Sequence, residues 1–331
     1  MLIRNVIRIC FILLLFCALT GCQAPSEDRT ETPSEAGKEK MPQDKTEDKG
    51  ANSLASIPKN SPDPAGGGER RTSPDKKENR SDKTAPGSSA DPPVDPSTLS
   101  NSLMAWWFMR NEDHMIPSAQ EEIDLTAYDA FYVKSNLKEG EKPVFLTFDC
   151  GYENGFTPRI LDVLKKHKAP AAFFVCKHFI KDQPDLIRRM KKEGHIVGNH
   201  TVNHICLPQA DERTIRKEIA DNASYMKETT GYDMDPFFRP PKGEYSERTL
   251  QIIKSMGYTT VFWSLAYVDY DVEKQPGAGY VIDHFNRYIH PGAIPLIHNI
   301  SSSNAEALDT VLDNLEKEGY SFCSLEDLKK F

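Results

Sequence analysis

Short apolar segments alternate with amphipathic segments from residue 143 to the end of this 331-residue chain. Seven apolar segments have the composition of buried strands, at residues 144–148, 171–175, 196–197, 237–238, 259–265, 293–297 and 321–325. Helical spacing of apolar residues occurs between them, at residues 158–167, 184–193, 212–230, 246–256 and 304–318. This alternation predicts an α/β fold, a parallel sheet covered by helices that curls into a distorted (β/α)7-type barrel.

Polar residues stand where several of these predicted strands end. Asp149 ends the first strand, His200 follows the third, Arg239 ends the fourth and His298 ends the sixth. The carboxyl ends of parallel barrel strands share one rim, and active sites in such barrels lie there. The sequence therefore predicts a single site that combines these four side chains.

The first 21 residues have the features of a secretory signal peptide. Arg4 and Arg8 precede an apolar run at residues 9–19, which is too short for a comfortable transmembrane helix. Residues 19–22 resemble a bacterial lipobox, which implies that Cys22 is lipidated and becomes the mature N-terminus. The alternative is an uncleaved membrane anchor. Either way we expect export, and the lipobox predicts a lipid anchor on the outer face of the cytoplasmic membrane, in the cell envelope or the forespore envelope.

Residues 22–97 are predicted to be a disordered tether. From residue 23 to residue 96 the chain has no Phe, Tyr or Trp and contains eleven of its 23 prolines. Such a segment buries too little apolar area to offset its chain entropy. A tether would let a lipid-anchored domain reach into a thick polymer layer. A dispensable spacer is the alternative.

Residues 98–331 are predicted to form a single folded domain, which we expect to be monomeric. The net charge of −8 argues against a nucleic acid as the main partner. Seven cysteines occur, and the four within this domain have irregular spacing, so no disulfide framework is assigned.

His200 and His204 are four residues apart, which places two imidazoles on one side of a helical turn or tight loop. An isolated pair with this spacing is more often a surface or helix-capping feature. Here it directly follows a β-like run that ends at Gly198 and Asn199, and a carboxylate ends another strand. We therefore favour a metal-binding pair.

The remaining polar residues suggest two partnerships. Asp149 is costly to bury unless it is paired, and Arg239, held by two following prolines, offers a fixed cation that keeps a carboxylate ionised. A structural ion pair is equally compatible with this spacing. Asp269 could orient His298 and hold it protonated, as a general acid requires, whereas an isolated strand-end histidine is more often a core or turn residue.

Five segments, at residues 147–151, 199–204, 239–243, 263–269 and 296–298, resemble the motifs of the polysaccharide deacetylases, which are carbohydrate esterases of family 4 with a NodB homology domain. Further segments are similar to one branch of this family, the peptidoglycan N-acetylmuramic acid deacetylases of spore-forming bacteria that lead to muramic delta-lactam. These segments are residues 151–155, 181–184, 193–195, 262–264, 290–294 and 304–309.

The resemblance implies a role for each motif residue. Asp149 matches the catalytic base and Arg239 the residue that positions it, while His298 matches the general acid and Asp269 its carboxylate partner. His200 and His204 match the ligands of one divalent metal ion, for which we expect zinc. The backbone N–H of Lys242 matches the oxyanion donor. Tyr152, Glu153 and Asn154 are candidates for contacts with sugar. Glu153 and Asn154 could instead cap the following helix.

Cys150 departs from the family pattern. The broad family resembled here has a metal-binding aspartate in this place, and the muramic-acid branch has an asparagine. A thiolate is a good zinc ligand, so we expect Cys150 to bind the metal. The alternative is a neutral thiol of similar size, with the metal held by two histidines and water.

The resemblance implies a metal-dependent N-deacetylase that acts on N-acetylmuramic residues of peptidoglycan, with glycan strands as its partner, and leads to muramic delta-lactam in the spore cortex. One alternative is a deacetylase of N-acetylglucosamine in peptidoglycan or chitooligosaccharides. An alternative of another class is a non-catalytic, glycan-binding surface lipoprotein, which the altered Cys150 position would suit.

Overall fold

The computed structural model describes residues 94–120 and 122–330. The predicted signal peptide, Cys22 and the predicted tether up to residue 93 lie outside the described residues. Residues 94–97, the end of the predicted tether, lie beside helix α5 (Glu247–Ser255), where Gln251 Nε2 donates a hydrogen bond of 3.4 Å to the carbonyl oxygen of Val94. Within the described ranges, no helix combines the length and apolar character needed to cross a bilayer.

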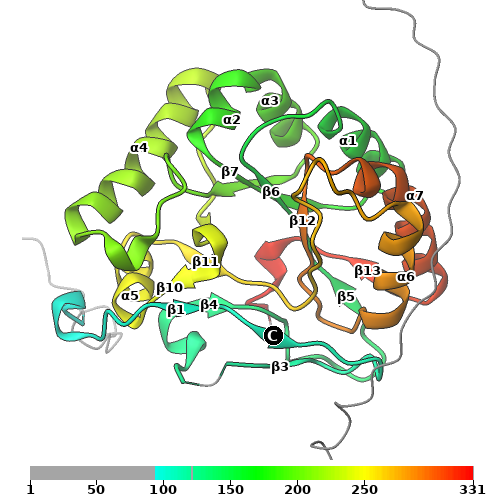
Figure 1. Cartoon of the computed structure of the whole chain (residues 1–331), viewed down its shortest axis with the longest axis horizontal. Helices are drawn as coiled ribbons and strands as arrows, with labels where there is room; N and C mark the ends of the chain where they lie inside the picture. The colour runs from blue at the N-terminus through cyan, green and yellow to red at the C-terminus, as the bar shows by residue number, and fades with distance from the viewer. Residues whose placement is uncertain (1–93, 121, 331) are drawn as a thin grey trace, which may run out of the picture. The chain divides into compact units, whose positions relative to one another are not determined.

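A seven-stranded parallel sheet lies at the centre of the described part (Figure 1). From one edge to the other, its strands are β12 (Leu296–His298), β6 (Leu146–Cys150), β7 (Ala171–Val175), β8 (Ile196–Asn199), β9 (Phe237–Phe238), β11 (Thr259–Val261) and β4 (Ala130–Phe131). Every pair of neighbours in this order is parallel. The predicted α/β barrel architecture is confirmed.

The two edge strands, β4 and β12, approach each other without forming a continuous ladder. Isolated bridges join Val133 to Ala293 and Leu265 to Pro295 across this seam. Gly292 closes it most tightly, because its carbonyl accepts a hydrogen bond from Lys134 N (3.0 Å) and a Cβ at this position would lie 2.1 Å from Lys134 O. Only glycine fits there, at a φ of +81°.

The identity of the seventh strand differs from the prediction. The segment predicted at residues 321–325 forms only β13 (Ser321–Phe322), which pairs with β5 (Pro143–Val144) outside the main sheet. The first predicted strand is divided between two sheets. Leu146–Cys150 form β6 in the main sheet, whereas Pro143 and Val144 pair with β13 outside it. Phe145 lies between the two parts, and its backbone N–H bonds to Ala293 O. Strand β4 fills the seventh place, and it is too short to show periodicity.

Helices surround the strands in an arc in Figure 1. They are α1 (Thr157–Lys166), α2 (Lys177–Asp182), α3 (Pro184–Lys192), α4 (Glu212–Thr230), α5, α6 (Ala278–Tyr288) and α7 (Ser302–Lys317). The sequence pattern predicted all of these except α2 and α6. Helix α4 has the predicted bounds because Asp211 caps its first turn and Gly231, at a φ of 83°, ends it.

The N-terminal part of the domain wraps against this core in short elements. They are η1 (Pro96–Thr98), β1 (Met104–Ala105), β2 (Phe108–Met109), β3 (Ser118–Ala119) and η2 (Leu125–Tyr128). Strand β1 pairs with β10 (Glu244–Tyr245), and Trp106 stacks on Phe262 with ring centroids 4.6 Å apart. Further short helices are η3 (Leu207–Gln209), η4 (Pro241–Gly243) and η5 (Leu325–Asp327).

Alternate residues along β6 and β7 face opposite sides of the sheet. Leu146, Phe148 and Cys150 belong to the apolar cluster that contains residues of the covering helices. Phe174 belongs to a different cluster, inside the barrel, and pairs in register with Asp149. Asp149 therefore points into the barrel, and Cys150 points away from it.

Candidate active site

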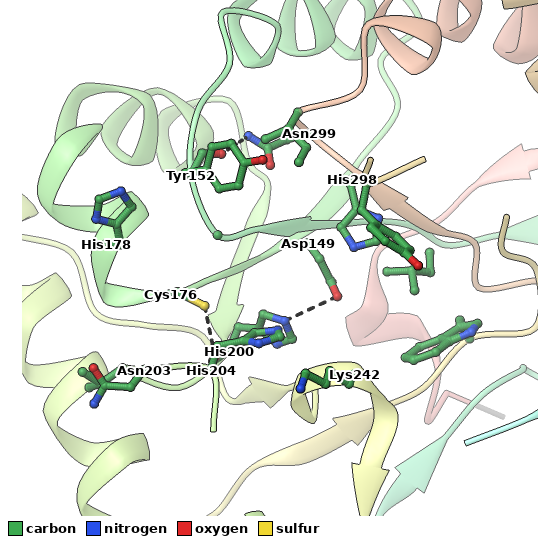
Figure 2. A pocket seen from close by; sticks show the side chains of 16 residues that line it. Asp149, Tyr152, Cys176, His178, His200, Asn203, His204, Lys242, His298 and Asn299 are labelled. Carbon is green, nitrogen blue, oxygen red and sulfur yellow. Dashed lines mark hydrogen bonds and ion pairs between the residues drawn. The ribbon is translucent and has the colours of Figure 1, made fainter. Parts of the chain in front are cut away.

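A cavity of about 890 Å³ opens at the carboxyl ends of the strands (Figure 2). Five strands contribute a residue that lies within two positions of the strand end. These residues are Asp149, Cys176, His200, Trp263 and His298, and Lys242 lines the cavity from η4, which follows β9. The single rim site expected from the strand order is therefore present.

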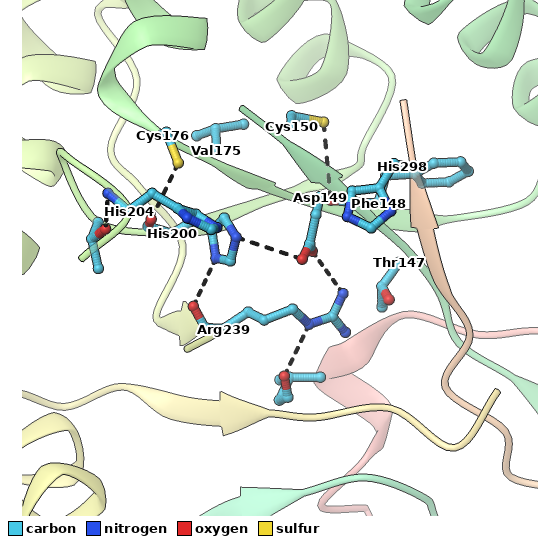
Figure 3. A network of polar contacts seen from close by, with 12 residues as sticks. Thr147, Phe148, Asp149, Cys150, Val175, Cys176, His200, His204, Arg239 and His298 are labelled. Atoms are coloured by element: carbon cyan, nitrogen blue, oxygen red, sulfur yellow. Dashed lines mark hydrogen bonds and ion pairs between the residues drawn. The ribbon is translucent and has the colours of Figure 1, made fainter. Parts of the chain in front are cut away.

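Asp149 and Arg239 form a buried ion pair inside this rim (Figure 3). Arg239 Nη1 donates to Asp149 Oδ1 at 2.8 Å, and its Nε donates to the carbonyl of Val261 at 3.0 Å. The Arg239 side chain is fully buried, and its guanidinium lies 4.4 Å from the centroid of the Phe174 ring. A charge without exposure and with several fixed partners holds one position, so Asp149 is presented in one orientation.

The surroundings of Asp149 keep it ionised. Burial acts to raise its pKa, but the charge of Arg239, the hydrogen bond from Arg239 and the charge of His298 outweigh burial and lower the pKa below its usual value. A carboxylate at this place is thus available to accept a proton.

His200 faces the second oxygen of the same carboxylate. Its Nδ1 lies 2.8 Å from the carbonyl oxygen of Arg239, which can only accept, so Nδ1 carries the proton. Burial lowers the pKa of His200 to about 4, so the ring is neutral and Nε2 has a free lone pair. This Nε2 lies 3.5 Å from Asp149 Oδ2. Two lone pairs that face each other in a buried site favour a cation between or beside them.

His204 completes the pair on a tight loop. Its backbone is left-handed, with a φ of 54°, and its N–H donates to Thr201 Oγ1 at 2.9 Å. The two imidazole centroids are 4.8 Å apart, and burial lowers the pKa of His204 as well. Two neutral imidazoles beside a carboxylate fit a divalent metal ion.

A different group of potential ligand atoms is more compact than this pair. Within residues 94–120 and 122–330, the group whose histidine and carboxylate atoms all lie within 4.8 Å of one another is His167, Asp313 and Glu316. His167 Nε2 lies 2.9 Å from Asp309 and its Nδ1 lies 3.3 Å from Glu316. Carboxylates already occupy both sides of this imidazole, so the cluster is a network of polar contacts between the end of α1 and helix α7.

His298 and Asp269 form the second partnership. His298 Nδ1 donates to Asp269 Oδ1 at 2.7 Å, and the His298 backbone N–H donates to Asp269 Oδ2 at 2.8 Å. Burial acts to lower the pKa of His298, but the hydrogen bond and charge of Asp269 outweigh it, and the pKa is raised. His298 lines the cavity, so its protonated ring can serve a group bound there.

Cys150 does not lie where its predicted ligand role requires. It does not line the cavity, its side chain is fully buried in the cluster under the helices, and its thiol contacts Phe148 O at 4.0 Å (Figure 3). Burial, together with Asp149 and other acidic groups, raises its pKa well above the usual value, so the thiol is neutral. This placement corresponds to the alternative, a neutral thiol.

Cys176 lies in the cavity instead, although no sequence motif singled it out. Its Sγ donates to His200 O at 3.3 Å, which steadies the loop that carries the two histidines (Figure 2). Burial and the nearby Asp149 raise its pKa to about 12. Its position after β7, one step beyond Val175, gives it the same facing as Asp149 on the neighbouring strand. The four described domain cysteines are all free.

The three candidate sugar contacts separate. Tyr152 lines the cavity, whereas Glu153 and Asn154 do not. Glu153 Oε1 accepts from Thr157 N (3.1 Å) and so caps α1, and Asn154 Nδ2 donates to Ile300 O (3.2 Å). For Glu153, capping of the next helix is the alternative that the structure supports.

Lys242 lines the cavity in a left-handed conformation, with a φ of 57°. Its predicted role as backbone oxyanion donor stays a prediction. Trp263, Tyr270 and Asn299 also line the cavity without having been assigned from the sequence. Tyr270 contacts the edge of the His298 ring, at 5.7 Å between centroids.

Comparison with known proteins agrees with this site. Residues 136–261 match the family model described as polysaccharide deacetylase. The chain is 46% identical to the peptidoglycan-N-acetylmuramic acid deacetylase PdaA of Bacillus subtilis, over 69% of this chain and 86% of the relative. The solved structure of that protein, a family 4 carbohydrate esterase, has 45% identity and a TM-score of 0.66 over 70% of this chain and 98% of its own.

A peptidoglycan-N-acetylglucosamine deacetylase of Bacillus cereus is 31% identical over 64% of this chain and 98% of its own length. The rim site on a parallel barrel combines an ion-paired carboxylate with a histidine–aspartate pair, which are groups suited to general base and general acid catalysis. The chain belongs to the polysaccharide deacetylase family, carbohydrate esterase family 4. It is a deacetylase, which hydrolyses carbon–nitrogen bonds other than peptide bonds.

Proposed function

We propose that this protein is a metal-dependent peptidoglycan deacetylase that removes the acetyl group of N-acetylmuramic acid. The 46% identity to PdaA over most of that protein supports the substrate, and the cavity at the barrel rim supports the chemistry. The signal-like segment and Cys22 support a lipid-anchored enzyme outside the cytoplasm, facing the glycan strands. The observation that carries the proposal is the neutral His200 Nε2 opposite the ionised Asp149.

His200 and His204 would hold the divalent ion, for which zinc suits two imidazoles. When bound, the ion would act as a Lewis acid toward the acetamide carbonyl and the attacking water. Asp149 accepts a proton from that water, and Arg239 keeps Asp149 ionised and oriented. The Lys242 backbone N–H is proposed to donate to the oxyanion. His298, held by Asp269, gives its proton to the departing amine, and acetate is released.

The freed amine would then attack the lactyl carboxyl group of the same muramic residue. An amide bond forms, water leaves, and the product is muramic delta-lactam. This step needs a muramic residue whose peptide has been removed, because the peptide otherwise occupies the lactyl carboxyl.

The first prediction concerns the substrate. Incubating the full-length protein and zinc with glycan strands from which an amidase has removed the peptides should shift muramic fragments by the loss of one acetyl group, followed by the loss of one water. Mass spectrometry of the released fragments measures both changes. Unstripped glycan is the control and should stay unchanged. Acetyl loss confined to glucosamine residues would support the glucosamine alternative instead.

The second prediction concerns the metal. Removing divalent ions with a chelator should abolish acetate release, and added zinc should restore it. His200→Asn should bind zinc at least about 100-fold more weakly, because ligand loss costs more than the roughly 10- to 100-fold typical of outer-shell changes. His178→Asn is the matched control, since His178 also lines the cavity but is exposed and pairs with Asp182. Equal zinc affinity of the two variants, measured by calorimetry, would exclude His200 as a ligand.

A further inference from the structure

A chain of buried hydrogen bonds continues from the His298–Asp269 pair into helix α7. Asn304 Nδ2 donates to Asp269 Oδ2 at 2.7 Å and lies 3.2 Å from the carbonyl oxygen of His298. On its other side, Tyr267 Oη donates to Asn304 Oδ1 at 2.8 Å. Asn304 is 2% exposed, Asp269 1% and Tyr267 9%, so water does not compete for these bonds.

The side chains of His298 and Asn304 bind different oxygens of the Asp269 carboxylate. Asp269 Oδ1 accepts from the imidazole, while Oδ2 accepts from the backbone of His298 and from Asn304. Among the described residues, His298 and Asn304 are the two whose side chains donate a hydrogen bond to this carboxylate. Without it, the carboxylate could rotate about its last torsion and carry the imidazole with it.

The carboxylate of Asp269 fixes which way the amide of Asn304 points, and the hydroxyl of Tyr267 holds the other end of the amide. The amide oxygen accepts from Tyr267, so the amide nitrogen must face Asp269. The reverse orientation would place the amide oxygen against the carboxylate of Asp269 and the carbonyl oxygen of His298, both of which can only accept. Asp269 therefore selects the orientation, and the hydrogen bond from Tyr267 holds the amide in it.

The start of helix α7 sets the position of Asn304. Ser301 caps the helix by accepting from the backbone N–H of Asn304 at 3.1 Å, which places Asn304 in the first turn. An asparagine in a helix is less favourable than an alanine, so the helix itself does not call for this residue. The contacts with Asp269 and Tyr267 account for its presence.

We propose that Asn304, with its amide fixed by Tyr267, is a positioning residue that holds Asp269 and thereby aims the imidazole of His298 into the cavity. The inference rests on the proposed role of His298 as general acid. The general acid is then supported by a hydrogen-bonded series of four residues, His298, Asp269, Asn304 and Tyr267. Asn304 belongs to the segment 304–309, to which the mechanism above gives no role.

The test compares variants of the full-length protein for acetate release. Asn304→Ala should lower kcat about 10- to 100-fold and change KM less than twofold, because a misaimed catalytic group costs chemistry and spares binding. Tyr267→Phe keeps the ring and removes one oxygen, and it should lower kcat severalfold. Asn314→Ala is the matched control on the same helix, because the Asn314 side chain donates an exposed hydrogen bond of 3.3 Å to Asn286 Oδ1.

A spectroscopic reading separates positioning from general damage. The His298 proton shared with Asp269 at 2.7 Å should give a downfield proton NMR signal, identified by its loss in His298→Gln. This signal should shift or broaden in Asn304→Ala and stay in place in Asn314→Ala. A folded Asn304→Ala protein with unchanged kcat and unchanged signal would overturn the inference. If Asn304→Ala does not fold, unchanged kcat in Tyr267→Phe overturns it instead.

His298→Gln distinguishes the two levels of the proposal. Acetate release at the normal rate in His298→Gln would remove the proposed acid itself. Loss of activity in His298→Gln, with full activity in Asn304→Ala and Tyr267→Phe, would leave the acid in place and remove only the role of Asn304.

Discussion

Asp149→Asn is expected to lower kcat for acetate release by about 10²- to 10⁴-fold, the usual contribution of a general base. Asparagine has the shape of aspartate, and its Oδ1 can still accept from Arg239 Nη1, but it cannot take a proton from water. Acetate release measured over a range of substrate concentrations should show the loss in kcat.

The same substitution leaves the buried Arg239 without its counter-charge. The free energy of unfolding should therefore fall, by about 3 kcal/mol, while the protein stays folded at 25 °C. Asp182→Asn is the control, because Asp182 is a surface residue that pairs with His178 at the cavity rim, and it should change neither quantity. Normal turnover in Asp149→Asn would remove Asp149 as the base.

Arg239→Met should lower the free energy of unfolding by about 3–5 kcal/mol at pH 7, because it leaves a buried carboxylate without its cation. Methionine fills part of the space between the Phe174 and Trp263 rings that the guanidinium occupies, so cavity formation adds little. Chemical denaturation of both proteins measures the difference. Acetate release should fall together with stability, because burial then dominates and protonates Asp149.

The pH dependence of this stability difference has a definite sign. In the native protein the pKa of Asp149 is lowered, so its ionised form stabilises the fold above the unfolded pKa, and this contribution is lost as the pH falls. In Arg239→Met the pKa of Asp149 should be raised, so acid relieves the buried charge. The gap between the two proteins should therefore narrow on acidification.

A double variant provides the internal control. Asp149→Asn with Arg239→Met removes both charges and should recover part of the stability that either single change loses, while remaining inactive. Additive losses in the double variant would mean that the two side chains do not interact, contrary to their 2.8 Å contact.

The meeting of Asp149, His200, Arg239 and His298 could be predicted from the sequence because each stands at the end of a strand. Parallel strands place their ends at one rim, so the order of motifs along the chain was enough. The prediction for Cys150 rested on its place in the family motif and on the affinity of thiolates for zinc. Strand β6 runs through Cys150, and neighbours on a strand point to opposite sides, so this side chain turns away from the cavity that Asp149 lines.

Other features had no sequence signal of this kind. Strand β4 has two residues, and helix α6 begins at Ala278 after the N-cap residue Gly277, which has no side chain to cap it, so neither element shows the usual signals. Cys176 and Asn304 gain their meaning from residues distant in the chain, His200 and Asp269. Contacts of this type depend on the assembled barrel, and no local pattern encodes them.

The neighbour relation between β12 and β6 has a consequence for synthesis. These strands pair directly, although one lies near the start of the sheet-forming segment and the other near the end of the chain. A polypeptide that ends before residue 296 would keep Asp149, Arg239 and the His200–His204 pair. One edge of β6 would then expose unpaired backbone N–H and C=O groups. Prematurely terminated products should consequently aggregate and be degraded. The enzyme should become active only after its C-terminal segment has been synthesised and has added β12 to the sheet.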